Sequence, residues 1–146
     1  MKHKSMMQWQ SKEQLQLDDN DQVVLEIARY FFMSWAARQS RGWEEALAKS
    51  NAAFGPIRGQ SIAFALLDAL IQMRDARKNL FVFNNPRCEK YRTHITHCER
   101  HLLSALQQTK RGRQSAACVD AMILCEGNEM TAFIERLRDL SAALEQ

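Results

Sequence analysis

Five side chains that can bind a transition metal lie close together in the chain: Cys88, His94, His97, Cys98 and His101. His97 and His101 are four residues apart, so on a helix both imidazoles project from one face, and that spacing lets them hold one ion. Cys88, on the preceding loop, is the predicted third ligand, with His94 or Cys98 as the fourth. Mixed sulfur and nitrogen ligands favour zinc. One interpretation of the chain is therefore a small zinc-binding protein, and zinc is the one cofactor that the sequence suggests.

The same stretch also fits an ordinary amphipathic helix. It contains no C-x-x-C pair, and the charge of its many Arg and Lys residues opposes a bound cation. In this interpretation Cys98 packs into the core with Ile95 and Leu102, while His97 and His101 lie on the flank of the helix. The sequence leaves both interpretations open and favours the structural one.

Basic residues dominate the middle of the chain. Residues 74–113 carry ten Lys/Arg and three Asp/Glu, whereas residues 1–73 are neutral overall and residues 114–146 have a net charge of −4. This division predicts either a polyanion-binding surface or packing of the basic middle against the acidic tail. Tyr91 is interleaved and placed to stack on a base, and phosphate contacts need no sequence readout. The candidate phosphate-binding side chains are Arg87, Lys90, Arg92, Arg100, Lys110, Arg111 and Arg113.

Little in the chain predicts an enzyme. Cys98 has His94 and His101 within reach on one helix, which would lower the pKa of its thiol, but catalytic thiols usually meet a base from another element. Gly55 and Gly59 stand alone, without the pattern of a phosphate-binding loop. We therefore name no catalytic residue and expect a non-enzymatic protein, with a thiol enzyme left open.

Hydrophobic periodicity predicts helices rather than strands. The acidic cluster at residues 18–21 can cap a first helix, and Thr96 and Glu99 have the spacing of a capping box. No segment sustains a two-residue alternation, so we expect no sheet. We predict an all-α fold, a compact single-domain bundle of five or six helices, with residues 1–17 as a polar tail and residues 18–146 as the bundle. The expected helices span about 18–38, 43–54, 60–78, 96–110, 114–126 and 128–144.

Apolar residues cover most faces of the first and third expected helices. Six short helices cannot easily bury that much apolar surface in one chain, so we expect a homo-oligomer, most simply a two-fold dimer through one of these helices. We find no signal peptide and no apolar run long enough for a membrane, and the four cysteines lack a secreted pattern. The cytoplasm, with reduced thiols, is the expected compartment.

Taken as a whole, the residues favour a non-enzymatic helical binding or regulatory module. It would act through protein contacts or through the basic surface of residues 87–113. Two alternatives stay open: zinc binding by the Cys/His cluster, and binding to the phosphate backbone of nucleic acid without sequence readout.

Overall fold

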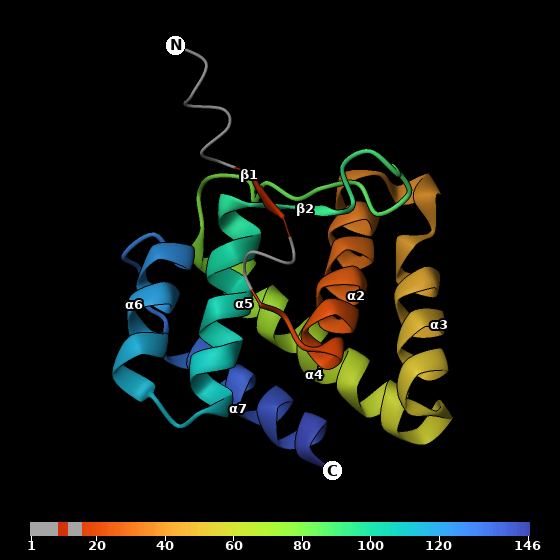
Figure 1. The fold of residues 1–146 in the computed structure, drawn as a ribbon. Helices are drawn as coiled ribbons and strands as arrows, with labels where there is room; N and C mark the ends of the chain where they lie inside the picture. Colours follow the sequence, from red (N-terminus) through yellow and green to blue (C-terminus); the bar gives the residue numbers. More distant parts are fainter. Residues whose placement is uncertain (1–8, 12–15) are drawn as a thin grey trace.

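Six α-helices and one short 3-10 helix form most of residues 9–11 and 16–146, the part of the chain that the computed structural model describes. This architecture confirms the all-α fold predicted from the sequence (Figure 1). No helix in the described residues is long and apolar enough to cross a membrane. The helices are α2 (Asp19–Ala36), η1 (Arg38–Ser40), α3 (Gly42–Phe54), α4 (Pro56–Ala76), α5 (His97–Lys110), α6 (Gln114–Leu124) and α7 (Thr131–Glu145).

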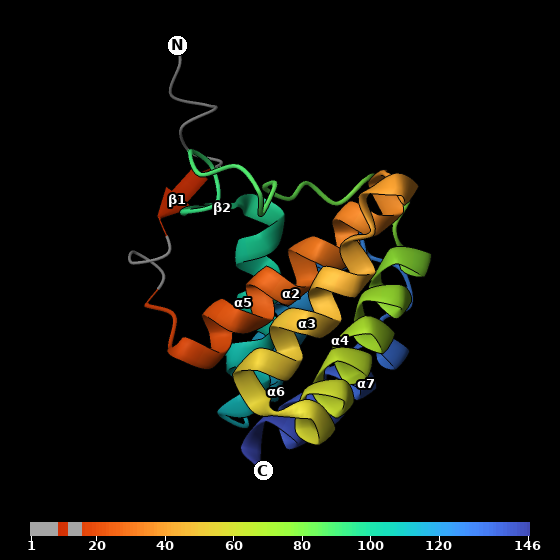
Figure 2. The same ribbon diagram turned by 90° about the vertical axis from the view of Figure 1, so that its right-hand side faces the viewer.

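The helices pack in pairs around one main core. α3 packs on α2 and α4, α6 packs on α5, and α4 also packs along α7. In Figure 1, α4 and α7 cross behind α2 and α5, with α3 and α6 on the outer sides. Figure 2 shows that the C-terminal ends of α2 and α4 lie at the same end of the bundle as the start of α3. That shared end is where segments far apart in the sequence meet.

The first helix is covered within one chain. Its run from Tyr30 to Met33 is buried on all sides, because α3, α4 and residues 81–83 pack around it. We predicted a dimer through this helix because we expected exposed apolar surface there, and the structure buries that surface within one chain. On α4, the only large hydrophobic side chains left exposed are Ile57 and Phe64. A dimer through the third predicted helix stays a prediction.

The third helix begins earlier than the sequence suggested. Its first residue is Pro56 rather than residue 60, since a proline is well suited to the first position of a helix. Gly59, which the expected span of 60–78 leaves outside this helix, lies inside α4. A Cβ at Gly59 would lie only 2.7 Å from the carbonyl oxygen of Ser50, and the Ser50 hydroxyl donates to the Gly59 carbonyl at 2.6 Å. This glycine permits the close approach of α3 and α4 and does not end a helix.

A small antiparallel sheet contradicts the expectation of no strands. β1 (Trp9–Ser11) pairs with β2 (His94–Thr96), with Trp9 opposite Thr96. Three residues are too few to show the alternation that identifies a strand in a sequence. The pairing places part of the predicted N-terminal tail beside the start of α5.

A buried ion pair joins α2 to α5. Arg29 is 1% exposed, and its Nε and Nη2 atoms donate to the two carboxylate oxygens of Glu99 at 2.8 and 2.9 Å. Arg29 Nη1 also donates to the carbonyl of Arg92 at 2.7 Å. Glu99 accepts from the backbone N–H groups of Asn84 and Thr96, both at 3.0 Å. One pair of side chains therefore joins α2, α5 and the long connection between α4 and α5.

Replacing this arginine tests how much of the fold depends on the pair. Arg29→Met leaves the Glu99 carboxylate buried without its counter-ion, so we expect the free energy of unfolding to fall by about 3–5 kcal/mol in denaturant titrations. The control is Arg138→Met, an exposed arginine of α7 with no ion pair among the described residues, which should change stability by less than about 0.5 kcal/mol. Similar losses in the two variants would contradict the role assigned to Arg29.

Candidate functional site

Two of the five predicted metal ligands come together in the first turns of α5. The Nε2 atoms of His97 and His101 lie 3.2 Å apart, and their rings meet edge to face at 86°. His101 is buried, whereas His97 is exposed to solvent. Partial burial, followed by the neighbouring charges of His101 and Arg100, lowers the pKa of His97 below its usual value. The pair therefore combines one buried and one solvent-exposed imidazole at the surface of α5.

A network from α6 and α5 orients the inner histidine. His101 Nδ1 lies 2.8 Å from Asp120 Oδ1, and the Ser104 hydroxyl donates to the other oxygen of Asp120 at 2.6 Å. The Nη2 atom of Arg100 lies 3.3 Å from His101 Nε2. Because a guanidinium can only donate, Nε2 must accept, so the proton of His101 sits on Nδ1 and is donated to Asp120. The same Nε2 atom also lies within hydrogen-bond distance of His97 Nε2.

The other three candidate ligands do not join this pair. His94 is exposed, and its Nδ1 lies 3.3 Å from the hydroxyl of Thr93. Cys88 and Cys98 are half-buried free thiols. Within the described residues, no group of three or more His, Cys, Asp or Glu side chains is arranged to hold a metal ion. The structure instead supplies Asp120, which the sequence analysis missed because it lies on a different helix.

Lys110 and Arg100 do not extend the predicted phosphate-binding surface. Lys110 Nζ lies 2.6 Å from Asp21 and 3.5 Å from Asp18, so two carboxylates of the first helix region compensate its charge. Arg100 turns toward His101.

The acidic tail meets the basic middle elsewhere, where Arg77 lies 3.8 Å from Glu126 within the same chain. The basic middle therefore packs against the acidic tail at this contact, and polyanion binding stays a prediction.

The remaining basic residues separate to the two ends of α5. Arg87, Lys90 and Arg92 precede this helix, and Arg111 and Arg113 follow it, a helix length of roughly 20 Å away. The first group lies at the bundle end that also holds the C-terminal ends of α2 and α4: Arg87 donates to the carbonyl of Ser40, directly after α2. We call this region the basic end. Its exposed cations with no carboxylate partner among the described residues are Arg38, Arg74, Lys78, Arg87, Lys90 and Arg92.

An aromatic hollow of about 360 Å³ opens at the basic end, between α2, α4 and residues 79–83. Phe32 and Phe81 stack with their ring centroids 4.3 Å apart, and Phe83 lies beside them. Trp35 forms another wall, with the Arg74 guanidinium 4.5 Å above its ring. Pockets for small organic groups are typically of this size, mostly apolar and edged by a few polar groups.

Residues 77–80 form one side of this hollow and are fixed to the end of α6. Arg77 donates to the carbonyl of Leu124 at 2.8 Å and to that of Leu80 at 3.3 Å. The Glu126 carboxylate accepts from the backbone N–H of Lys78 at 2.6 Å, and this hydrogen bond lowers the pKa of Glu126. The extended segment therefore has a defined place although it belongs to no helix or strand.

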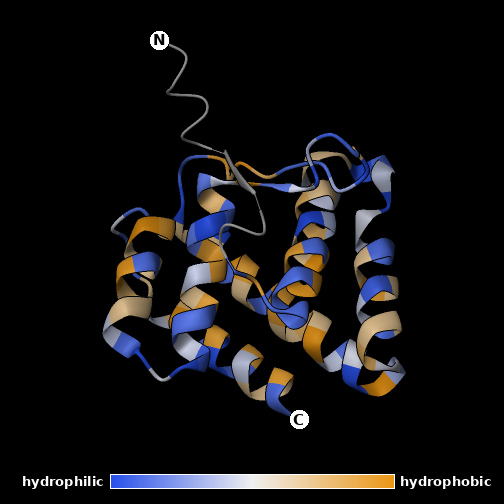
Figure 3. Cartoon of the chain, in the orientation of Figure 1, coloured by the Kyte–Doolittle hydropathy of each residue, from blue (hydrophilic) through white to orange (hydrophobic). Residues whose placement is uncertain are grey.

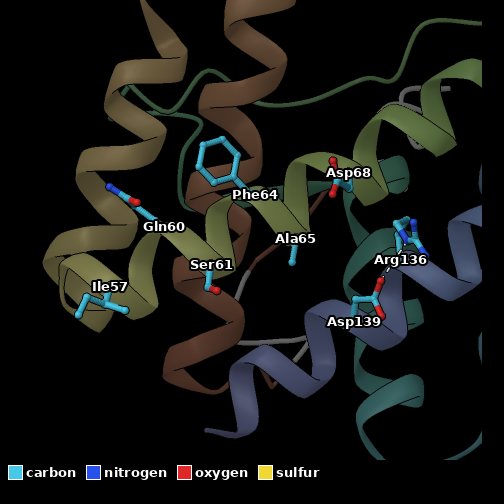
Figure 4. A pocket seen from close by; sticks show the side chains of 8 residues that line it. All are labelled: Ile57, Gln60, Ser61, Phe64, Ala65, Asp68, Arg136 and Asp139. Atoms are coloured by element: carbon cyan, nitrogen blue, oxygen red, sulfur yellow. Dashed lines mark ion pairs between the residues drawn. The ribbon is translucent and has the colours of Figure 1, made fainter.

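A second hollow, of about 430 Å³, lies between α4 and α7 (Figure 4). Arg136 and Asp139 pair along α7 at 3.1 Å, which leaves Asp68 as the only charged lining residue of the hollow outside an ion pair. Ile57 and Phe64 line its other side. This hollow lacks the aromatic walls and the surplus of cations found at the basic end, so it is the weaker candidate for a ligand site.

Fold and sites together define a single-chain, all-α helical bundle with a basic, aromatic-lined hollow at one end and a histidine pair on α5. Comparisons of the chain with protein-family models, with curated proteins and with solved structures give no significant match. The function must therefore be argued from these side chains themselves.

The thiols differ enough in their surroundings to test the side-chain packing. Burial raises the pKa of the Cys125 thiol to about 11, whereas Cys88, Cys98 and Cys118 are only half-buried. Because the thiolate is the reactive form, Cys125 should react with iodoacetamide more slowly than the other three in the native protein at pH 8. Timed labelling followed by peptide mass spectrometry measures this order, and denatured protein, in which all four should react, is the control. Fast native labelling of Cys125 would contradict the packing at the end of α6.

Proposed function

We propose that the protein is a non-enzymatic binding module that holds single-stranded nucleic acid at its basic end, without sequence readout. The observation that carries this proposal is the aromatic hollow, which lies among exposed cations that have no carboxylate partner in the described residues. Proteins that bind single strands combine these same two features: aromatic side chains for bases and a positive surface for the backbone.

The hollow offers a place for one base. Its aromatic walls, Phe32, Trp35, Phe81 and Phe83, come from α2 and from residues 81–83, and the stacked rings of Phe32 and Phe81 join these two segments. Stacking on an aromatic ring tolerates any base, because every base has a π-face. Arg74, already above the ring of Trp35, can stack on the same base or contact its phosphate.

The cations favour an extended ligand over a compact anion. They are spread over η1, the end of α4 and residues 87–92 instead of converging on one point. Residues 36–45 and 74–92 together carry eight Lys/Arg and four Asp/Glu, which leaves an excess of positive charge at this end. A phosphate backbone matches such a spread, since each phosphate needs only one nearby cation.

The proposal predicts binding that weakens steeply with salt and depends on the basic end. Fluorescence anisotropy with a labelled oligo(dT) strand should show log K falling linearly with log salt concentration. Lys78→Gln and Arg92→Gln should each reduce that slope by about 0.7–1, because each removes one phosphate contact. Trp35→Leu, which keeps the hollow apolar, should cost about 1–3 kcal/mol of binding free energy through lost stacking.

Arg111→Gln is the matched control, because it removes the same charge at the opposite end of α5. It should leave the salt slope unchanged. An equal effect of Arg111→Gln and Arg92→Gln would show that attraction is diffuse and not located at the basic end. Absence of binding to oligo(dT) at low salt would end the proposal.

We also propose a homodimer, as the sequence suggested, but with its contact surface on α6 instead of the first or third expected helix. The support is the outer face of α6, where Val119, Met122 and Ile123 are each about half exposed. Figure 3 shows this hydrophobic helix at the outside of the bundle. Leu80, a further exposed hydrophobic side chain at 90%, lies on the segment that Arg77 joins to the end of α6. The four free cysteines support a reducing compartment, and we place the protein in the cytoplasm on that basis.

Met122→Glu should abolish this dimer, because it introduces charge into the centre of the apolar face. Light scattering after size exclusion, over a range of protein concentrations, should show a concentration-dependent mass for the wild type and a monomer for the variant. The control is Phe64→Glu on α4, outside this surface, which should leave the mass unchanged. Loss of the dimer in the Phe64 variant alone would place the contact on α4 instead.

A further inference from the structure

The histidine pair of α5 has no part in the proposed binding of nucleic acid. We propose that His97 and His101 bind a divalent transition metal ion through their Nε2 atoms, and that Asp120 is the positioning residue of this site. The ion belongs to the zinc, nickel and copper group, which imidazole ligands suit.

The distance between the two nitrogens fits a shared ion. Two zinc–nitrogen bonds of about 2.0–2.1 Å that meet at the tetrahedral angle place the nitrogens about 3.3–3.4 Å apart. His97 Nε2 and His101 Nε2 are 3.2 Å apart, close to this separation, so an ion can replace the hydrogen bond between them once His97 carries its proton on Nδ1. Both histidines lie on one rigid helix, so little side-chain entropy is lost when the ion binds.

The partners of His101 are those that metal-binding histidines use. A ligating histidine commonly donates its second ring N–H to a carboxylate, which fixes the tautomer and makes the ring a better ligand. Asp120 does this at 2.8 Å, and Ser104 holds Asp120 in turn at 2.6 Å. Asp120 is buried on the far side of the ring from His97, so it orients the ligand without blocking the ion.

Two features of the site limit its affinity. Only two protein ligands converge among the described residues, so water or an external ligand must complete the coordination shell. The guanidinium of Arg100 lies 3.3 Å from His101 Nε2 and must move aside, since its charge repels a cation. Arg100 is partly exposed on the helix surface and can turn into solvent. Replacing Arg100 by a neutral residue should therefore raise the metal affinity, whereas replacing a ligand should lower it.

The experiment is calorimetric titration of Zn²⁺ and Ni²⁺ into the untagged, full-length protein at pH 7.5. We expect one ion per chain, and no binding of Mg²⁺, which prefers oxygen ligands. Among these variants His97→Ala should weaken metal binding most, because it removes one of the two protein ligands. Asp120→Asn should weaken it about 10- to 100-fold, as the loss of an outer partner does. Arg100→Gln should tighten it.

His94→Ala is the matched control, since His94 is an exposed histidine just before the pair and its Nδ1 atom lies against the hydroxyl of Thr93. It should leave zinc affinity unchanged, and circular dichroism of each metal-free variant checks that the helices are intact. Failure of the wild type to bind either ion, unchanged affinity in His97→Ala, or an equal loss in His94→Ala would overturn the proposal. Because the readout is metal affinity, each result is independent of whether the basic end binds nucleic acid.

Discussion

The buried pair of Arg29 and Glu99 is the interaction on which the rest of this structure depends. Two charges removed from water are stabilising only when every donor and acceptor finds a partner, and here the guanidinium and the carboxylate each make several hydrogen bonds. Glu99 also forms the capping box of α5 with Thr96. The pair therefore decides where α5 begins, and with it the register of His101 against α6.

The long connection between α4 and α5 contributes to both candidate sites. Its first residues line the aromatic hollow, and its last residue, Thr96, directly precedes the histidine pair. Side chains supply several of its backbone partners, because Arg77, Glu126 and Glu99 each bond to its main chain. The backbone N–H of Asn84 is buried, and such a group is costly when unpaired, which explains the position of the Glu99 carboxylate. The sites are thus positioned by electrostatics as much as by hydrophobic packing.

Charge has different roles in different parts of the molecule. Lys110 is compensated by Asp18 and Asp21, so it stabilises the fold and adds little to the surface field. The cations of the basic end are exposed and have no carboxylate partner within the described residues, so their field reaches solvent and would favour the proposed nucleic-acid ligand. A net charge of +3 for the whole chain conceals this difference. Only the positions of the carboxylates reveal which cations are available to a ligand.

The sequence by itself determined what depends on neighbours along the chain. The cap at Asp18, the capping box at Thr96 and the shared face of His97 and His101 all involve residues at most four positions apart, and local geometry is sufficient for them. Tertiary structure decided the rest: a glycine inside α4, a sheet too short to recognise, and the meeting of His101 with Asp120. Those features result from contacts between segments far apart in sequence, as Arg29 and Glu99 are, and local propensity carries no information about such contacts.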